Sequence, residues 1–268
     1  MKRPIVVTLT NHKGGVGKTT ISCNLSSSVC RLTKNSSKYK GLIIDFDPQG
    51  NTSDTMIKQG VFPEHTITEL FKYGGSPERC IYPTKSKNLD IMPCNLHLFM
   101  MEDFLRESEN RLMDLKIIFE ANKKVFKDYD FIIIDSPPNF GPFMLNAISA
   151  SDYYIVPIEA GSIYSLTGLH TLEKVINNHL KECGIDVKLL GYVLNQYDGR
   201  TIASKEMLSQ ARHFYKELLF DTVIRNNTTV KRAQACKKTV HQLEPHSYGA
   251  IDFNALAKEF IKKVKLHG

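Results

Sequence analysis

Short apolar runs of strand length recur along the chain, and most are separated by segments whose apolar residues follow helical spacing. The runs predicted as strands are Ile5–Thr10, Leu42–Phe46, Leu89–Met92, Phe131–Ile134, Tyr153–Ile158, Leu189–Leu194 and Thr222–Ile224. The spacing predicts helices over Gly17–Leu32, Arg111–Phe126, Ser165–Leu180 and Ile202–Leu219. Buried strands that alternate with helices predict an α/β fold, with a mainly parallel twisted sheet covered by helices on both faces.

The organisation along the chain is simple. Its 268 residues suffice for one large α/β domain, and neither an internal repeat nor a long linker is evident. We expect residues 1–268 to form a single domain, without a separate N-terminal helix-turn-helix domain. Thr33–Lys40 reads as a polar loop, and Val61–Lys87 as short surface elements. Without a signal peptide or an apolar run of about 20 residues, the sequence predicts a cytosolic protein.

The first predicted strand leads into a glycine-rich segment at the start of a predicted helix, Lys13-Gly14-Gly15-Val16-Gly17-Lys18-Thr19-Thr20. Glycines let successive backbone N–H groups point at one anion, and the helix N-terminus adds the positive end of its dipole. We expect this segment to bind the phosphates of ATP or ADP, with Lys18 neutralising the β- and γ-phosphates. The Thr19 hydroxyl is the expected ligand of Mg²⁺.

This segment departs from the usual P-loop pattern, because His12 stands five residues before Gly17 and Lys13 opens the loop. A lysine at the lip of the phosphate site is better placed to reach a partner's site than its own phosphates. The feature resembles the deviant Walker A box of the ParA/MinD family of dimerising P-loop ATPases. The resemblance implies that a homodimer forms on ATP binding and that Lys13, Lys18 and Asp47 are catalytic.

Two further segments place carboxylates at the ends of predicted strands. The segment 45–51, Asp-Phe-Asp-Pro-Gln-Gly-Asn, matches the ParA family, and this implies that Asp47 orients the attacking water and Asp45 supports the metal. The apolar run before Asp135 has the Walker B pattern, so Asp135 is expected to hold Mg²⁺ through a water. Ligands bind at the carboxyl ends of parallel strands, and we therefore expect these carboxylates beside the glycine-rich loop.

The resemblance continues to the C-terminus and is to the short ParA/Soj type. Asn195 ends a predicted strand where the family often places a side chain that contacts adenine, although an asparagine there can equally cap the next turn. The chain departs from the family near residue 225, where Arg225 replaces a proline. A second departure is the stretch 231–235, Lys-Arg-Ala-Gln-Ala, which replaces Ser-Glu-Ala-Pro.

The six cysteines do not indicate a metal or redox site. They stand at positions 23, 30, 80, 94, 183 and 236, and none forms a C-x-x-C pair. The loop after the Walker B strand, Ser136-Pro137-Pro138, has no cysteine, so an iron–sulfur cluster like that of the related nitrogenase iron protein is not expected.

The basic charge is concentrated at the C-terminal end. Residues 200–268 hold 13 Lys and Arg against 6 Asp and Glu, whereas residues 1–199 hold 22 of each. A localised basic surface indicates a polyanionic partner. The family resemblance implies nonspecific binding of double-stranded DNA by the ATP dimer, and the candidate contacts are Arg200, Lys205, Lys231, Arg232, Lys237 and Lys238.

Near the C-terminus, an apolar stripe of Phe253, Leu256, Ala257, Phe260, Ile261 and Val264 is flanked by lysines. This pattern fits a helix on a membrane surface, as in MinD-like proteins, or a helix docked on the sheet; we favour docking. Together the motifs predict a Mg²⁺-dependent ATP hydrolase. The resemblance implies that it is of the partition type, segregates plasmid or chromosome DNA, hydrolyses ATP slowly until a ParB-like activator protein stimulates it, and associates with the nucleoid. The alternative is a MinD-like positioning ATPase acting on a membrane or protein assembly.

Overall fold

The computed structural model describes residues 3–34, 37–110, 112–161 and 164–266. Within them, one sheet has the strand order β5-β6-β4-β7-β1-β8-β9. Its strands are β1 (Ile5–Leu9), β4 (Gly41–Asp45), β5 (Tyr82–Pro83), β6 (Leu89–Met92), β7 (Phe131–Asp135), β8 (Tyr153–Glu159) and β9 (Lys188–Asn195). Neighbouring strands are parallel except for β5 and β6, which are antiparallel. The predicted mainly parallel sheet is confirmed.

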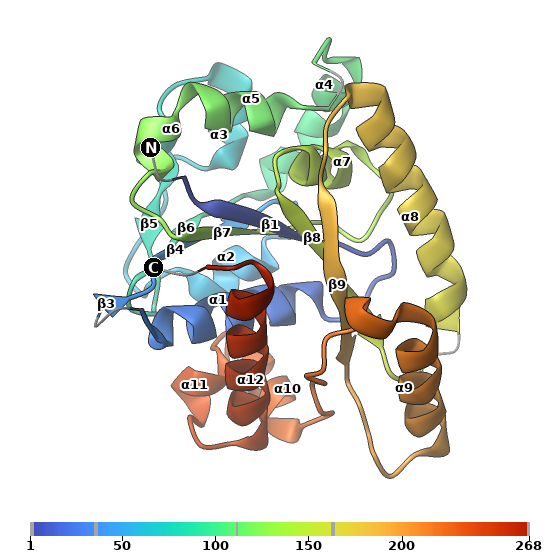
Figure 1. Ribbon diagram of the computed structural model, residues 1–268. Helices are drawn as coiled ribbons and strands as arrows, with labels where there is room; N and C mark the ends of the chain where they lie inside the picture. Colours follow the sequence, from blue (N-terminus) through green and yellow to red (C-terminus); the bar gives the residue numbers. More distant parts are fainter. Residues whose placement is uncertain (1–2, 35–36, 111, 162–163, 267–268) are drawn as a thin grey trace.

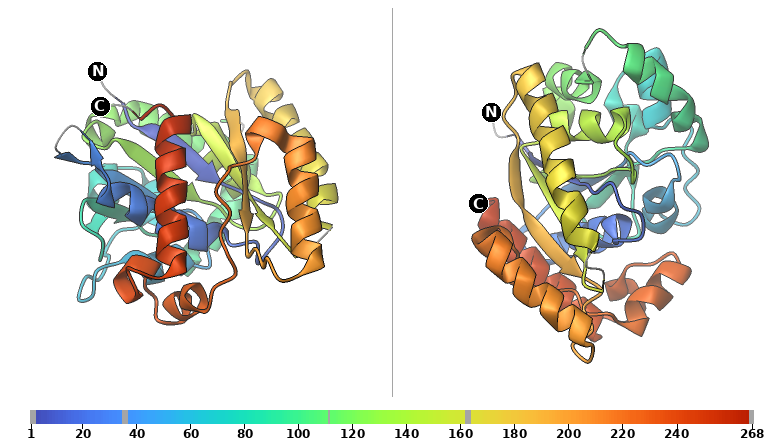
Figure 2. Two further views of the ribbon diagram at one scale, coloured as in Figure 1. Left: turned by 60° about the horizontal axis from the view of Figure 1, so that its bottom comes forward. Right: turned by 90° about the vertical axis from the view of Figure 1, so that its right-hand side faces the viewer.

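Helices cover both faces of the sheet (Figures 1 and 2). One face carries α1 (Lys18–Arg31), α2 (Asn51–Met56), α10 (Thr228–Ala235), α11 (Val240–Leu243) and α12 (Tyr248–Lys263). The opposite face carries α3 (Ile67–Tyr73), α4 (Met101–Glu107), α5 (Asp114–Ala121), α6 (Lys123–Phe126) and α7 (Pro142–Ser149). Beside β8 and β9 lie α8 (Tyr164–Cys183) and α9 (Ile202–Tyr215). The described residues also form the 3₁₀ turns η1 (Pro77–Cys80), η2 (Leu96–Met100) and η3 (Lys216–Leu218).

The central strands are apolar at successive positions because both of their faces are buried. In β7, Phe131 and Ile133 pack in the cluster that contains α1 and α12. Ile132 and Ile134 pack in the opposite cluster with α3 to α7. Side chains alternate across a strand, so an unbroken apolar run is what a strand covered on both faces requires.

The register of the central strands positions the site. Asp45 at the end of β4 pairs with Asp135 at the end of β7, and Asp135 pairs in turn with Leu9 at the end of β1. The chain leaves Leu9 through the glycine-rich loop and enters α1. The loop and both carboxylates therefore lie at the same edge of the sheet, as predicted.

The prediction of a single helix over Arg111–Phe126 is wrong, although residue 111 itself lies outside the described residues. The structure has two shorter helices, α5 and α6, on either side of Asn122. The backbone of Asn122 is not helical, and its side-chain amide donates to the carbonyl of Ile118 at 2.9 Å. A short amide side chain competes in this way with the helical hydrogen bonds of its neighbours.

Two other local predictions need correction. Thr222–Ile224 is not a strand: the backbone N–H groups of Asp221 and Thr222 donate to the Glu259 carboxylate on α12, at 2.8 and 2.9 Å. The polar segment Thr33–Lys40 contains a short antiparallel pair, β2 (Thr33–Lys34) and β3 (Ser37–Lys38), instead of a plain loop. Both outcomes depend on pairing partners that hydrophobic spacing does not encode.

The apolar stripe near the C-terminus is docked in the core, as favoured. Helix α12 buries Phe253, Leu256, Ala257 and Phe260 against α1 and the sheet. The Phe260 ring meets Phe131 of β7 edge-on, with ring centroids 6.4 Å apart. These side chains are therefore not available to a membrane surface in this conformation.

Candidate nucleotide site

The glycine-rich loop between β1 and α1 adopts the backbone conformation of a phosphate cradle. Gly15 and Gly17 have φ angles of 78° and 93°, which residues with a side chain rarely adopt. At Gly17 a Cβ atom would also lie 2.1 Å from Nδ2 of Asn195. Glycine is thus required at Gly17 for two independent reasons, backbone conformation and close packing.

Lys18 is held inside the site. Its side chain is 7% exposed, and its Nζ donates to the carbonyl of Lys13 at 3.4 Å. Burial lowers the pKa of Lys18, while the carboxylates of Asp135 and Asp47 oppose that shift. A partly desolvated ammonium between a backbone carbonyl and carboxylates is well placed to exchange them for phosphate oxygens.

Asp135 is fully buried at the end of β7 and accepts three hydroxyl hydrogen bonds. Thr19 and Thr52 donate to Oδ2 at 2.7 Å each, and Ser22 donates to Oδ1 at 2.9 Å. Burial raises the pKa of Asp135, and these hydroxyl bonds counteract the rise. The structure brings Thr19 and Asp135 into contact, as their assignment to one metal site requires.

Asp45 and Asp47 lie beside Asp135 but have different environments. Asp45 is fully buried, and Oδ2 accepts 2.7 Å bonds from the backbone N–H and hydroxyl of Ser53. Burial, with the nearby Asp135 charge, raises the pKa of Asp45 to about 7. The Asp47 carboxylate accepts from the N–H of Gln49 at 3.0 Å, and burial raises its pKa while Lys18 lowers it. Asp47 thus faces Lys18, and Asp45 anchors α2.

These residues fit a nucleotide-bound magnesium ion. Hydroxyl and carboxylate oxygens are the ligands that Mg²⁺ prefers, and Mg²⁺ sites commonly combine few protein ligands with water and substrate phosphates. Among the described residues, no group of three or more His, Cys, Asp and Glu is placed to hold a metal ion by itself. A site built from Thr19, Asp135 and phosphate oxygens agrees with both observations.

Lys13 lies at the lip of the loop, as predicted, and is in contact with its own chain. Its Nζ forms an ion pair with the Glu159 carboxylate at the end of β8, at 3.1 Å. Its backbone N–H donates to the Asn11 side chain at 3.0 Å. About a third of each partner's side chain in the ion pair is exposed, so the pair is partly screened by solvent.

Asn195 packs against the loop. It is 4% exposed, and Nδ2 donates to the carbonyl of Val16 at 2.8 Å, while the neighbouring Gln196 donates to the carbonyl of Gly15 at 2.8 Å. A cavity of about 140 Å³ adjoins these residues and is also lined by Thr20, Arg225 and Lys231, among others. Asn195 therefore stabilises the loop directly, beside a cavity next to the phosphate site.

Several residues of the site were not found from the sequence. Ser22, Thr52 and Ser53 hold the carboxylates, and Gln234 of α10 donates to the Thr20 hydroxyl. Ser22 could have been found from its spacing, since it follows Thr19 by three positions on one helix. Gln234 could not, because it is more than two hundred residues away from Thr20 in the sequence.

The structure distributes the six DNA candidates over two regions. Arg200 and Lys205 lie near the start of α9, whereas the other four lie in α10 or directly after it. All six are exposed, but three are paired with carboxylates: Arg200 with Asp198, Arg232 with Glu244, and Lys237 with Asp54. Lys237 and Lys238 line a cavity of about 340 Å³ that also contacts Thr19 and Thr20.

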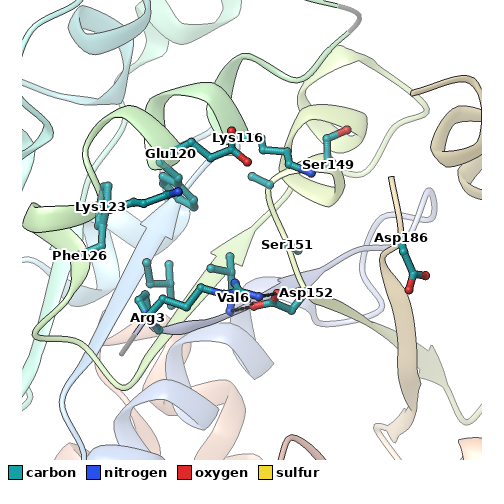
Figure 3. A pocket seen from close by; sticks show the side chains of 14 residues that line it. Arg3, Val6, Lys116, Glu120, Lys123, Phe126, Ser149, Ser151, Asp152 and Asp186 are labelled. Carbon is teal, nitrogen blue, oxygen red and sulfur yellow. Dashed lines mark hydrogen bonds and ion pairs between the residues drawn. The ribbon is translucent and has the colours of Figure 1, made fainter. Parts of the chain in front are cut away.

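A further pocket, of about 330 Å³, lies away from this site (Figure 3). It is lined by residues near the amino ends of β1, β7, β8 and β9, at the opposite edge of the sheet. The Arg3–Asp152 ion pair, at 2.7 Å, lies in the lower part of this view, and Lys116, Glu120 and Lys123 lie in the upper part. Because this pocket and the glycine-rich loop lie at opposite edges of the sheet, the pocket is not the phosphate site.

Comparison with known proteins agrees with the site. A family model described as an AAA domain matches residues 4–189. The chain is 31% identical to the sporulation initiation inhibitor protein Soj of Bacillus subtilis, covering 95% of this chain and 97% of that protein. It is 32% identical to the chromosome-partitioning ATPase Soj of Thermus thermophilus, covering 97% and 96%. Cobyrinic acid a,c-diamide synthase from Mycobacterium smegmatis, solved with ADP and magnesium, has a TM-score of 0.79, with 25% identity over 99% and 96% of the two chains.

The fold, the glycine-rich loop and its carboxylates define a P-loop ATPase. The chain belongs to the ParA/MinD family of these ATPases and is homologous to the Soj and ParA proteins over nearly its full length. Among the described residues, no helix is long and apolar enough to span a membrane.

Proposed function

We propose that this protein is a partition ATPase that dimerises on ATP, binds double-stranded DNA without sequence specificity and hydrolyses ATP slowly until a ParB-like protein stimulates it. The observation that carries the proposal is Lys13, a second lysine at the exposed lip of a P-loop whose own lysine, Lys18, is buried. The whole chain acts as one ATPase domain, in the cytoplasm and on the nucleoid. The Soj and ParA relatives support the cellular role.

The expected reaction is transfer of the γ-phosphoryl group of ATP to water, giving ADP and phosphate. Lys18 and the loop N–H groups bind the phosphates, and Thr19 with Asp135 holds Mg²⁺, which supplies positive charge next to the transferred group. Asp47 orients the attacking water. Asp45 supports the metal site, and its bonds to Ser53 fix the start of α2. Positioning of this kind contributes more than strong base catalysis to phosphoryl transfer.

Dimerisation is supported by the surface around the site. The carboxyl edge of the sheet carries exposed apolar side chains on η2 and in the loop after β7: Leu96, Phe99, Met100 and Phe140. Exposed apolar side chains at one edge are typical of a surface that another protein covers. We propose that a second copy covers it when ATP is bound and that Lys13 then leaves Glu159 for the partner's nucleotide.

DNA binding is supported by the excess of basic residues in the last quarter of the chain. Phosphate contacts need no base recognition, and a dimer doubles their number. If each subunit makes about four contacts, the slope of log affinity against log salt is about −7 for the dimer. A monomer with half of these contacts binds far more weakly at physiological salt.

The test is binding to a random-sequence duplex with ATP, with ADP and without nucleotide, at two salt concentrations. We expect binding with ATP alone, and a steep loss as salt rises. Absence of DNA binding in every state would contradict the proposal. Liposomes and a candidate protein scaffold would then test the alternative of a MinD-like positioning ATPase.

A further inference from the structure

A basic groove lies on the α1 and α12 side of the molecule, outside the nucleotide site. It has a volume of about 640 Å³, and its lining includes the end of α1, part of β3, the turn before β6, α11 and α12. Five of its lining residues are cations: Arg31, Lys38, Lys85, Lys87 and Lys258. No Asp or Glu is among the described residues that line it.

The floor of the groove is polar and uncharged. Ser27, Ser86 and Gln242 form a connected set, in which Ser86 Oγ lies 2.9 Å from Ser27 Oγ and accepts from Gln242 at 3.3 Å. His241 is buried there with its Nε2 3.0 Å from the hydroxyl of Ser28. Burial, followed by the charge of Arg31, lowers the pKa of His241 to about 4, so the imidazole is neutral at physiological pH.

Two of the cations are fixed by backbone carbonyls. Lys38 donates to the carbonyl of Arg31 at the end of α1. Lys85 donates to the carbonyls of Thr55 and Lys237, at 3.0 Å each. A concave surface with several cations and no lining carboxylate concentrates positive potential, and this favours an anion with several charges.

Lys85 connects the groove to two of the proposed DNA contacts. Its bond to Lys237 places the pair Lys237 and Lys238 next to the groove, and Lys237 is in turn bonded to the Asp54 carboxylate. The basic surface therefore continues from the cavity beside Thr19 and Thr20, along Lys85, to Lys87 and Lys258. An elongated track of this kind fits a chain of phosphates.

We propose that the groove binds the phosphate backbone of duplex DNA, through Arg31, Lys38, Lys87 and Lys258. The inference rests on the proposed function. It adds three cations from residues 1–199, a part of the chain that has no net charge overall, to a DNA surface expected only in the last quarter. No Phe, Tyr or Trp is among the described lining residues, and the ring of His241 is buried, so the groove lacks the stacking platforms that single strands use. Cations with hydroxyl and amide donors suit backbone contact with a duplex.

The test uses the full chain with Lys87→Gln and Lys258→Gln together. Both side chains are exposed, and glutamine removes the charge while it keeps much of the side-chain length. If each lysine contacts one phosphate, the salt slope of the ATP dimer becomes shallower by about 0.9 per lysine, or about 3.6 for the dimer. DNA affinity at fixed salt is expected to fall at least tenfold. The matched control is Lys174→Gln with Lys181→Gln, which removes the same charge from the exposed side of α8.

The outcomes separate the groove from the proposed function. Suppose that the wild type binds DNA with ATP and that the groove variant has the same DNA affinity and the same salt slope. This result would overturn the proposal for the groove and leave the proposed function intact. A wild type that binds no DNA in any nucleotide state would overturn both. Tripolyphosphate binding that is lost in the groove variant, with unchanged DNA binding, would assign the groove to a free polyanion and contradict the proposal. ATP affinity and thermal unfolding of the variant are measured in parallel and are expected to match the wild type.

Discussion

Two lysines five residues apart in one loop have opposite environments. Lys18 is enclosed with a carbonyl and two carboxylates, and its charge is compensated inside the site. Lys13 lies outside, against the partly exposed Glu159. Exposed ion pairs contribute about 0–1 kcal/mol, so Lys13 can leave Glu159 at little cost. The two side chains are therefore suited to different tasks, binding within one subunit and contact with another.

Substitution of each lysine distinguishes these tasks. Lys18→Ala is expected to abolish ATP binding and hydrolysis, because the phosphates lose their buried cation. Lys13→Ala is expected to leave ATP binding by the monomer near the wild-type value and to abolish the ATP-dependent dimer. Fluorescent ATP titration and light scattering measure the two quantities. Normal ATP-dependent dimerisation of Lys13→Ala would show that Lys13 has no role between subunits.

The hydrogen bond from Asn195 to the loop carbonyl of Val16 leads to a second prediction, which concerns nucleotide affinity. Asn195→Ala removes the donor to Val16 and leaves a cavity against Gly17, so the loop loses about 1 kcal/mol of support. We expect ATP and GTP affinities to fall by a similar factor, about fivefold. A fall for ATP with unchanged GTP binding would instead identify Asn195 as an adenine contact. Asn178→Ala, at an exposed position of α8, is the control.

At the scale of elements, α12 shows how one periodic pattern is compatible with two environments. Its apolar stripe fits a membrane surface or a protein core equally well, because both require one apolar face. In the structure the stripe is filled by contacts with α1 and β7. The strand and helix patterns of the sheet were predicted well, whereas the break at Asn122 and the irregular segment before Arg225 were set by individual side-chain hydrogen bonds.

Phe260 provides the test for this helix. Phe260→Ala removes a fully buried ring and is expected to lower the free energy of unfolding by about 3–5 kcal/mol. Ile251→Ala, at a half-exposed position of the same helix, should change it by less than about 0.5 kcal/mol. Denaturant unfolding measures both. If Phe260→Ala left the stability unchanged and abolished vesicle binding, the result would contradict docking and support a helix on a membrane surface.

At the scale of the whole molecule, the fold brings together charged residues that lie far apart in the sequence. Residues 1–199 are neutral overall, yet Arg31, Lys38, Lys85 and Lys87 converge with Lys258 in one groove. The last quarter carries the net charge, but three of its candidate contacts are paired with carboxylates. The linear charge count therefore did not reveal that cations from both parts of the chain line one groove.

His241 of α11 is buried against Ser28 of α1, and this contact predicts that the stability of the protein depends on pH. Folding lowers the pKa of His241 to about 4, from about 6.5 in an unfolded chain. The unfolded chain therefore binds more protons between these values, and stability is lost as pH falls from about 6.5 toward about 4. His241→Gln is expected to remove about 2 kcal/mol of the loss between pH 7 and pH 5, because about 1.5 units of that range lie below the unfolded pKa. Thermal unfolding at pH 7 and pH 5 measures it, with the exposed His213→Gln as control; an equal acid loss in His241→Gln would contradict the assignment.

The sequence by itself determined the α/β class, the phosphate loop and the carboxylates at the strand ends. These features are local, because strand burial, loop conformation and the loop's chemistry each depend on a few consecutive residues. Only the tertiary structure decided that Asn195 and Gln234 support the loop, that Lys13 pairs with Glu159, and that the basic groove exists. Such contacts join residues up to 214 positions apart, and their distances follow from packing of the whole chain rather than from any local pattern.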